Sequence, residues 1–292
     1  MLRIIAALLL LTTPAAAVES DTSPHRLRWD PSWRRSNWID YTASAAITGY
    51  ALYLQFGVRK PTHGNWTRPI LFDEEVEEAT VAGSYGTRNK AAAVGDGLFY
   101  GLQLLPFVDS AVTPLLFDHG NDEVAWELEM MNIQATSTMF ALARTGHRFV
   151  ARERPDVTKC NGNPSFSETC FGGSYSSFPS GHTAAAFAGA GLMCAHHTRL
   201  PLWGDPIADA SACVVPLALA ATTGATRLMA ARHWATDVLA GAVLGFGTGY
   251  GMPTLLHYAP LAGRSRDLAL TWAVHPYAAG DTGQGIAISG LF

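Results

Sequence analysis

A run of eighteen residues without charge, from Tyr41 to Val58, is closed by Arg59 and Lys60. A helix of this length can cross a bilayer, at the short end of the usual range. Charged residues make up only 15% of the chain, against about 25% in typical soluble domains, and apolar residues make up 48%. The sequence therefore predicts a helical protein with extensive buried or lipid-facing surface. It lacks the basic field that nucleic-acid binding requires.

Three more apolar runs follow in the second half, at residues 183–196, 211–230 and 233–250. Glycines recur in two of them, where small residues let helices approach closely: Gly189, Gly191, Gly241, Gly245 and Gly249. From residue 268 the pattern changes to alternation around a turn at 280–283, which is typical of a β-hairpin. We predict an all-α helical bundle of about six core helices, embedded in a membrane, with a small C-terminal β-hairpin.

The chain of 292 residues shows no low-complexity linker and no internal repeat, which favours one domain. We divide it into an N-terminal arm and first apolar helix (18–90), a helical core (91–262) and a hairpin tail (263–292). Two core segments, 91–117 and 122–144, contain acidic residues and need a polar interior if they cross a membrane. A soluble helical bundle therefore stays open. We interpret the acidic cluster at 73–78 as a solvated amphipathic helix rather than a metal site.

The first seventeen residues resemble an export signal, with Arg3, an apolar stretch and three alanines ending at Ala17. We expect residues 1–17 to be a signal peptide, or else an uncleaved anchor. Either way the protein is expected to be exported, to the inner membrane with a periplasm-facing site or to the periplasm.

The four cysteines include no Cys-x-x-Cys pair, so we expect no structural zinc. Cys160 and Cys170 flank a polar loop, which a disulfide would tie down in an oxidising compartment. Cys194 and Cys213 lie in apolar runs, where buried thiols are expected, although a second disulfide is possible.

Pro179-Ser180-Gly181-His182 stands directly before an alanine-rich run. Ser180 is a suitable helix N-cap, and the amides of Gly181 and His182 would then be free to bind an anion at the helix N-terminus. A second stretch contains Arg227, His233 and Asp237. His233 and Asp237 are four residues apart, so on a helix the carboxylate can accept a hydrogen bond from the imidazole. Arg227 reaches the same place only if the helix breaks near residue 231 or 232.

Arg154, which precedes Pro155, adds a second guanidinium suited to phosphate oxygens. The three stretches together resemble the signature of the type 2 phosphatidic acid phosphatase superfamily. That superfamily includes lipid phosphatases, acid phosphatases and vanadium-dependent haloperoxidases. The second part, Pro-Ser-Gly-His, matches in full. The third matches at Arg227, His233 and Asp237, with Thr226 where the family has serine. The first matches at Arg154-Pro155, with His147 where the family has lysine.

The resemblance implies roles for these residues. His233 would attack phosphorus and form a phosphohistidine, oriented by Asp237. His182 would protonate the leaving oxygen and then activate water. Ser180, Gly181, Arg154 and Arg227 would bind the phosphate, with His147 as a weaker donor or Arg148 reaching in from the next position. No metal and no cofactor are required, apart from vanadate if the chain is a haloperoxidase.

The resemblance implies a phosphatase acting on phosphate monoesters or pyrophosphates. The apolar helices favour a lipid phosphate as substrate and the membrane as partner; the sequence does not indicate an oligomeric state. Three alternatives stay open: a soluble periplasmic acid phosphatase, a vanadium haloperoxidase, and a degenerate protein that binds lipid phosphate without hydrolysing it.

Overall fold

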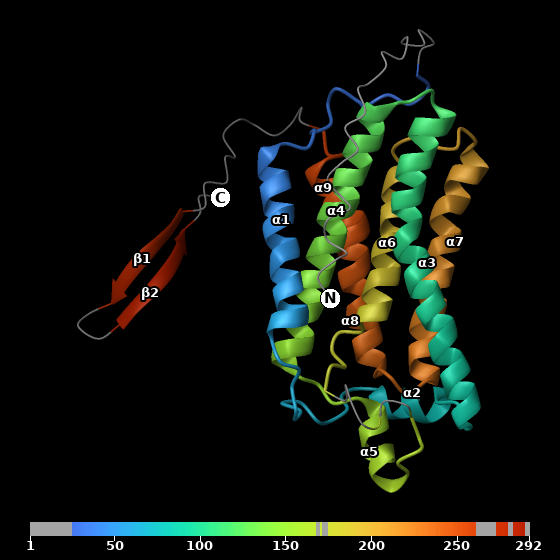
Figure 1. The fold of residues 1–292 in the computed structure, drawn as a ribbon, viewed down its shortest axis with the longest axis vertical. Coiled ribbons are helices and arrows are strands. Elements are labelled where there is room, and N and C mark those ends of the chain that lie inside the picture. The colour runs from blue at the N-terminus through green and yellow to red at the C-terminus, as the bar shows by residue number, and fades with distance from the viewer. Residues whose placement is uncertain (1–24, 168–169, 171–174, 261–272, 280–282, 290–292) are drawn as a thin grey trace, which may run out of the picture.

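The computed structural model describes residues 25–167, 170, 175–260, 273–279 and 283–289. The proposed signal peptide lies outside the described residues. Long helices run side by side along one axis, and two short helices close one end of the bundle (Figure 1). The long helices are α1 (Trp38–Leu52), α3 (Tyr85–Phe117), α4 (Asp122–Thr145), α6 (Gly181–His197), α7 (Pro206–Met229) and α8 (Ala235–Phe246). The predicted bundle of about six core helices is confirmed.

Shorter elements complete the chain. The two short helices at the end of the bundle are α2 (Asp73–Thr80) and α5 (Pro155–Gly162). Three π-helical turns extend longer helices: η2 (Tyr53–Gly57), η3 (Gly146–Val150) and η4 (Gly247–Gly251), the last leading into α9 (Met252–Leu256). In the tail, β1 (Ala273–Ala279) pairs antiparallel with β2 (Gly283–Ser289), with Ala273 opposite Ser289.

Helix α6 is the centre of the bundle and contacts α3, α4, α7 and α8. Alanines on several of its faces, including Ala184 and Ala188, are fully buried. A Cβ atom on Gly245 would lie 2.1 Å from the carbonyl oxygen of Ala184, and one on Gly249 would lie 2.1 Å from that of Ala188. Glycine is therefore required where α8 and η4 cross α6, as the small-residue pattern predicted.

A disulfide joins Cys194 of α6 to Cys213 of α7. The expectation of two buried thiols was therefore wrong, because the close packing of these helices brings the two sulfurs together. A second disulfide, between Cys160 and Cys170, closes the polar loop as expected.

Three helical segments are long and apolar enough to cross a membrane: Tyr85–Phe117, Pro206–Met229 and Ala235–Leu256. The run at 41–58 is not among them, because its Thr, Tyr and Gln residues lower its hydropathy; it forms α1 and η2, which pack against α4. Helix α3 is continuous in spite of its acidic residues and prolines.

The polar interior that the acidic core segments require is present. Asn132 of α4 donates to the hydroxyl of Ser110 and accepts from His196 in the centre of the bundle. Asp109 of α3 accepts hydrogen bonds from His197 and Trp203. These partners satisfy groups that would otherwise be costly to bury.

Candidate active site

The three sequence stretches meet at the end of the bundle that carries α2 and α5 (Figure 1). There they enclose a cavity of about 110 Å³. Its lining comes from α3, α4, η3, the start of α6 and the segments before α5, α6 and α8: Phe99, Phe140, Ala143, Arg144, His147, Arg154, Ser176, Gly181, His182 and His233. Five residues singled out in the sequence thus lie around one space.

His233 stands between α7 and α8, where the chain breaks as predicted. Helix α7 ends at Met229, Ala231 has a positive φ of 53°, and α8 begins at Ala235. Nδ1 of His233 lies 2.7 Å from the carbonyl oxygen of Ser177. A carbonyl only accepts, so Nδ1 carries the proton and Nε2 keeps its lone pair. Burial, followed by the positive charge of Arg154, lowers the pKa of His233 well below its ordinary value. The imidazole is therefore neutral, with an unprotonated Nε2.

His182 lies in the first turn of α6, which begins at Gly181 behind the predicted N-cap, Ser180. Its Nε2 is 3.0 Å from a carboxylate oxygen of Asp96 in α3. Burial and the charge of Arg227 lower the pKa of His182 to about 4, whereas Asp96 acts in the opposite direction. A bound phosphate dianion would also raise this pKa, since a nearby negative charge favours the imidazolium form. His182 is placed to gain its proton when an anion arrives.

Arg154 lines the cavity from the N-cap position of α5. Burial lowers its pKa to about 10, so it stays a cation at neutral pH. Its Nε is buried and has no hydrogen-bond partner among the described residues. A buried, incompletely paired guanidinium fits an anionic ligand.

Arg227 lies beside the cavity rather than in its lining. It donates to Asp96 over 2.9 Å and also bonds the carbonyl oxygen of Ala92. Asp96 therefore links Arg227 to His182. Within the part of the chain that the structure describes, no three or more His, Cys, Asp or Glu side chains are grouped so that they could hold a metal ion.

Comparison with known proteins agrees with this geometry. Residues 131–260 match the family model described as the PAP2 superfamily, which is the type 2 phosphatidic acid phosphatase superfamily that the motifs resemble. Residues 131–260 belong to this superfamily. A lipid A 1-phosphatase of Porphyromonas gingivalis is 34% identical over 107 residues, which are 37% of this chain and 19% of the relative. The chain thus matches about a fifth of that relative's length. No solved structure gives a significant match.

The PAP2 region carries all three motif stretches, but Asp237 does not contact His233 as expected. Its carboxylate instead accepts from Arg152 over 2.6 Å and from the hydroxyl of Ser177 over 2.6 Å. The spacing of four residues fails here because His233 precedes α8 and is not on the same helix. Asp237 acts indirectly: it holds Ser177, whose carbonyl oxygen fixes the His233 ring.

Arg148 and Ser180 also differ from expectation in this PAP2 site. Arg148 points away from the cavity and donates to the carbonyl oxygens of Leu54 and Gln55, 2.7 and 3.0 Å away. Ser180 is fully buried, and its hydroxyl is bonded to that of Thr183 over 2.8 Å. Ser180 therefore shapes the start of α6, while Gly181 faces the cavity.

His147 lines the cavity without offering it a donor. Its Nε2 lies 2.8 Å from the carbonyl oxygen of Pro179, so the proton is on Nε2. Nδ1 must then be an acceptor, and it lies 3.3 Å from Nη1 of Arg144. Burial lowers the pKa of His147 to about 3, so the ring is neutral. Both ring nitrogens of His147 thus have partners within the protein, so the ring offers no further N–H to the cavity, in contrast to the expected role as a weaker phosphate donor.

Several residues of this PAP2 site were missed in the sequence. Asp73, interpreted as part of a solvated acidic helix, is fully buried and accepts from Arg152 over 2.6 Å. Asp96 was only one of the acidic residues in segment 91–117, and Arg144 was not singled out. Asp73 and Asp96 are 79 and 86 positions from their partners Arg152 and His182, so no local spacing indicates them, whereas Arg144 is only three residues from His147.

Replacing Asp96 by asparagine is expected to shift the basic limb of the pH profile. The negative charge of Asp96 raises the pKa of His182, so its removal lowers that pKa further. With His182 in the general-acid role that the motif resemblance implies, it must be protonated to act, and activity would be lost at a pH about one unit lower. Measurement of kcat/KM for phosphate release between pH 4 and 9 tests this. If the variant lost activity at the same basic pH as the wild type, Asp96 would not control the protonation of His182.

Proposed function

We propose that this protein is a lipid phosphatase that hydrolyses a phosphate monoester or pyrophosphate through a phosphohistidine at His233. The observation that carries the proposal is the cavity in which a neutral His233, His182 and Arg154 face one small space. It combines a nucleophile, an acid and a cation for the phosphate oxygens, as phosphoryl transfer requires.

In the proposed reaction the Nε2 lone pair of His233 attacks phosphorus while the bond from phosphorus to the ester oxygen breaks. His182 gives its proton to that oxygen, so the alcohol leaves neutral. Water then attacks the phosphohistidine as His182 takes the water's proton. The nitrogen–phosphorus bond breaks, and phosphate and a neutral His233 are released. The hydrogen bond from Nδ1 to Ser177 supports this role, since it keeps Nε2 unprotonated.

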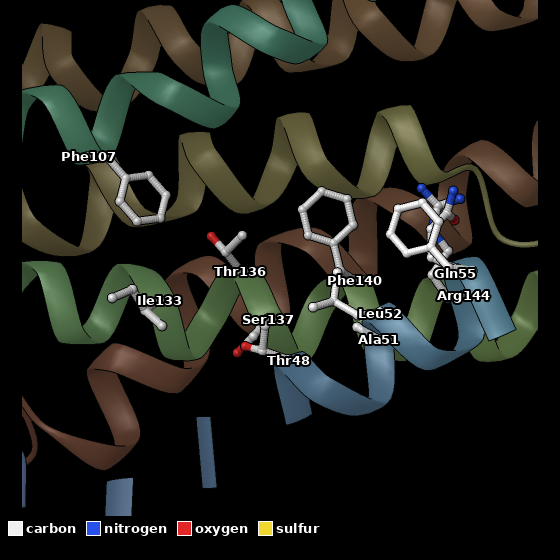
Figure 2. A pocket seen from close by; sticks show the side chains of 11 residues that line it. Thr48, Ala51, Leu52, Gln55, Phe107, Ile133, Thr136, Ser137, Phe140 and Arg144 are labelled. Carbon is white, nitrogen blue, oxygen red and sulfur yellow. The ribbon is translucent and has the colours of Figure 1, made fainter. Parts of the chain in front are cut away.

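The dimensions of the site favour a lipid substrate. The cavity of about 110 Å³ is well below the roughly 300–1,000 Å³ of sites that hold a whole small molecule. Beside it lies an apolar groove of about 420 Å³ between α1, α3 and α4 (Figure 2). Phe140 and Arg144 line both spaces. A phosphate in the cavity could thus continue into an acyl chain in the groove.

The compartment proposed for the site is the periplasmic face of a membrane. The disulfides between Cys160 and Cys170 and between Cys194 and Cys213 support an oxidising environment. The three long apolar helical segments support residence in a bilayer.

A panel of phosphorylated lipids in mixed micelles, with detection of free phosphate, tests the proposal. It should include phosphatidic acid, phosphatidylglycerol phosphate, undecaprenyl pyrophosphate and phosphorylated lipid A. We expect release from at least one member and inhibition by orthovanadate, which resembles the transition state. Halide oxidation dependent on vanadate, without phosphate release, would support the haloperoxidase alternative.

Filling the groove is expected to separate lipid from soluble substrates. Thr48 is exposed on α1 and lines the groove, so Thr48→Trp would occupy it without altering the cavity. We expect kcat/KM for a long-chain lipid phosphate to fall at least about tenfold, since several buried methylenes lose their place. Release from para-nitrophenyl phosphate should stay unchanged.

Ala46→Trp is the matched control, because Ala46 is also exposed on α1 but does not line the groove. Equal loss in the two variants, or no loss in either, would remove the groove from substrate binding.

A further inference from the structure

The cavity lacks the cation that the first motif of the superfamily provides. His147 takes the place of the motif lysine, and it is neutral, with its only N–H directed to Pro179. Arg148, the next cation along the chain, is held by the backbone of η2. If neither contributes, the phosphate meets one fewer positive charge than in a site with the full motif.

Arg144 supplies a charge at this place. It lies in the last turn of α4, three residues before His147, so both side chains are on the same side of the helix. Its side chain lines the cavity together with Arg154, His182 and His233. Within the described part of the chain no carboxylate pairs with Arg144, whereas Arg227 is paired with Asp96.

We propose that Arg144 binds the substrate phosphate in place of the motif lysine, and that His147 is a positioning residue that holds the Arg144 guanidinium toward the cavity. This inference rests on the proposed phosphatase function. The guanidinium donates to Nδ1 of His147 through Nη1, which leaves its other N–H groups for phosphate oxygens.

The position of Arg144 also specifies where the ester is held. Arg144 and Phe140 are the residues common to the cavity and the apolar groove, and Figure 2 shows Arg144 at one end of that groove, near Gln55. A phosphate bound by Arg144 therefore lies at the junction of the two spaces. That is the arrangement needed for a monoester attached directly to a lipid.

The experiment compares full-length variants in detergent, with para-nitrophenyl phosphate and a long-chain lipid phosphate as substrates. Arg144→Gln keeps a donor for His147 but removes the charge, and it should lower kcat/KM for both substrates about 100-fold. It should also raise the inhibition constant of orthovanadate. Arg144→Lys restores the charge and should recover at least about tenfold. Arg148→Met should stay within about threefold of wild type.

His147 is tested by rescue. His147→Ala should raise KM and the orthovanadate inhibition constant, whereas His147→Gln, which can donate to Pro179 and accept from Arg144, should restore both. The double variant Arg144→Gln/His147→Lys places the cation at the motif position and should recover activity over Arg144→Gln alone. A merely structural role for Arg144 predicts no recovery.

The possible outcomes distinguish a failure of the Arg144 proposal from a failure of the proposed phosphatase function. If wild type releases no phosphate from any substrate, the proposed function fails. If wild type is active and Arg144→Gln equals it, only the role of Arg144 is overturned. If Arg144→Gln does not fold, the kcat/KM values of Arg144→Lys and Arg148→Met are compared instead. A greater loss of kcat/KM in Arg148→Met than in Arg144→Lys would contradict the inference.

Discussion

His233→Ala is expected to abolish phosphate release, with kcat/KM falling by at least roughly 10⁴-fold, since removal of a covalent nucleophile leaves only binding and electrostatic effects. The other two histidines of the cavity are engaged elsewhere: His147 donates to the carbonyl oxygen of Pro179, and His182 pairs with Asp96 and is the acid of the proposed reaction. The measurement is free phosphate release from the best lipid substrate, at equal concentrations of folded enzyme.

His63→Ala is the control, because His63 is exposed and does not line the cavity. It should retain wild-type kcat/KM. If His233→Ala kept more than about one hundredth of the activity, a different nucleophile would have to carry the reaction, and the assignment of His233 would be wrong.

Arg152→Met is expected to destabilise the protein by roughly 3–5 kcal/mol. The guanidinium is fully buried between the carboxylates of Asp73 and Asp237, with a distance of 2.6 Å to each. It also lies over the ring of Trp66, 3.9 Å from the ring centroid. Removing it leaves two buried carboxylates without their cation. The free energy of unfolding in mild detergent measures the loss.

Two further variants show that this effect comes from burial. Arg35→Met removes a cation from the exposed pair with Glu123 and should cost no more than about 1 kcal/mol. Adding Asp73→Asn to Arg152→Met should recover part of the loss, because one uncompensated carboxylate is then neutral. Equal destabilisation in Arg35→Met and Arg152→Met would show that the buried ion pairs of Arg152 with Asp73 and Asp237 stabilise the protein no more than an exposed pair does.

Arg152 also connects stability with the site. Asp237, held by Arg152, accepts from the hydroxyl of Ser177, and the carbonyl oxygen of Ser177 fixes the tautomer of His233. Asp73 reaches the same assembly from α2 and also accepts from the backbone amide of Thr236. The short helix α2, which covers this end of the bundle, thus helps to hold His233 in place.

Local signals predicted the helical bundle and half of the residues that line the cavity. The N-cap at Ser180, the break at Ala231 and the glycine contacts of Gly245 and Gly249 follow from propensity, spacing and residue size. These effects act within one helix or between two helix faces, so they are visible in a single sequence.

What sequence reasoning missed depends on side chains that meet only after folding. Arg152 pairs with Asp73 across 79 positions, and His182 with Asp96 across 86 positions. The disulfide from Cys194 to Cys213 likewise needs α6 and α7 in contact. Motif spacing placed Asp237 against His233 because both residues were assumed to lie on one helix. Helix α8 begins only at Ala235, so His233 lies outside it and the assumption does not hold.

The central claim, that His233 carries the phosphoryl group, is tested most directly by trapping the intermediate. Wild type is mixed with a substrate labelled at its phosphorus, stopped within the first turnover in alkali, and analysed by peptide mass spectrometry. We predict one phosphorylated residue, His233, whose label is stable in base and lost in acid. In His182→Ala the label should accumulate with para-nitrophenyl phosphate, whose leaving group departs without a proton. A label on any other residue, or turnover without any label in either protein, would contradict the account.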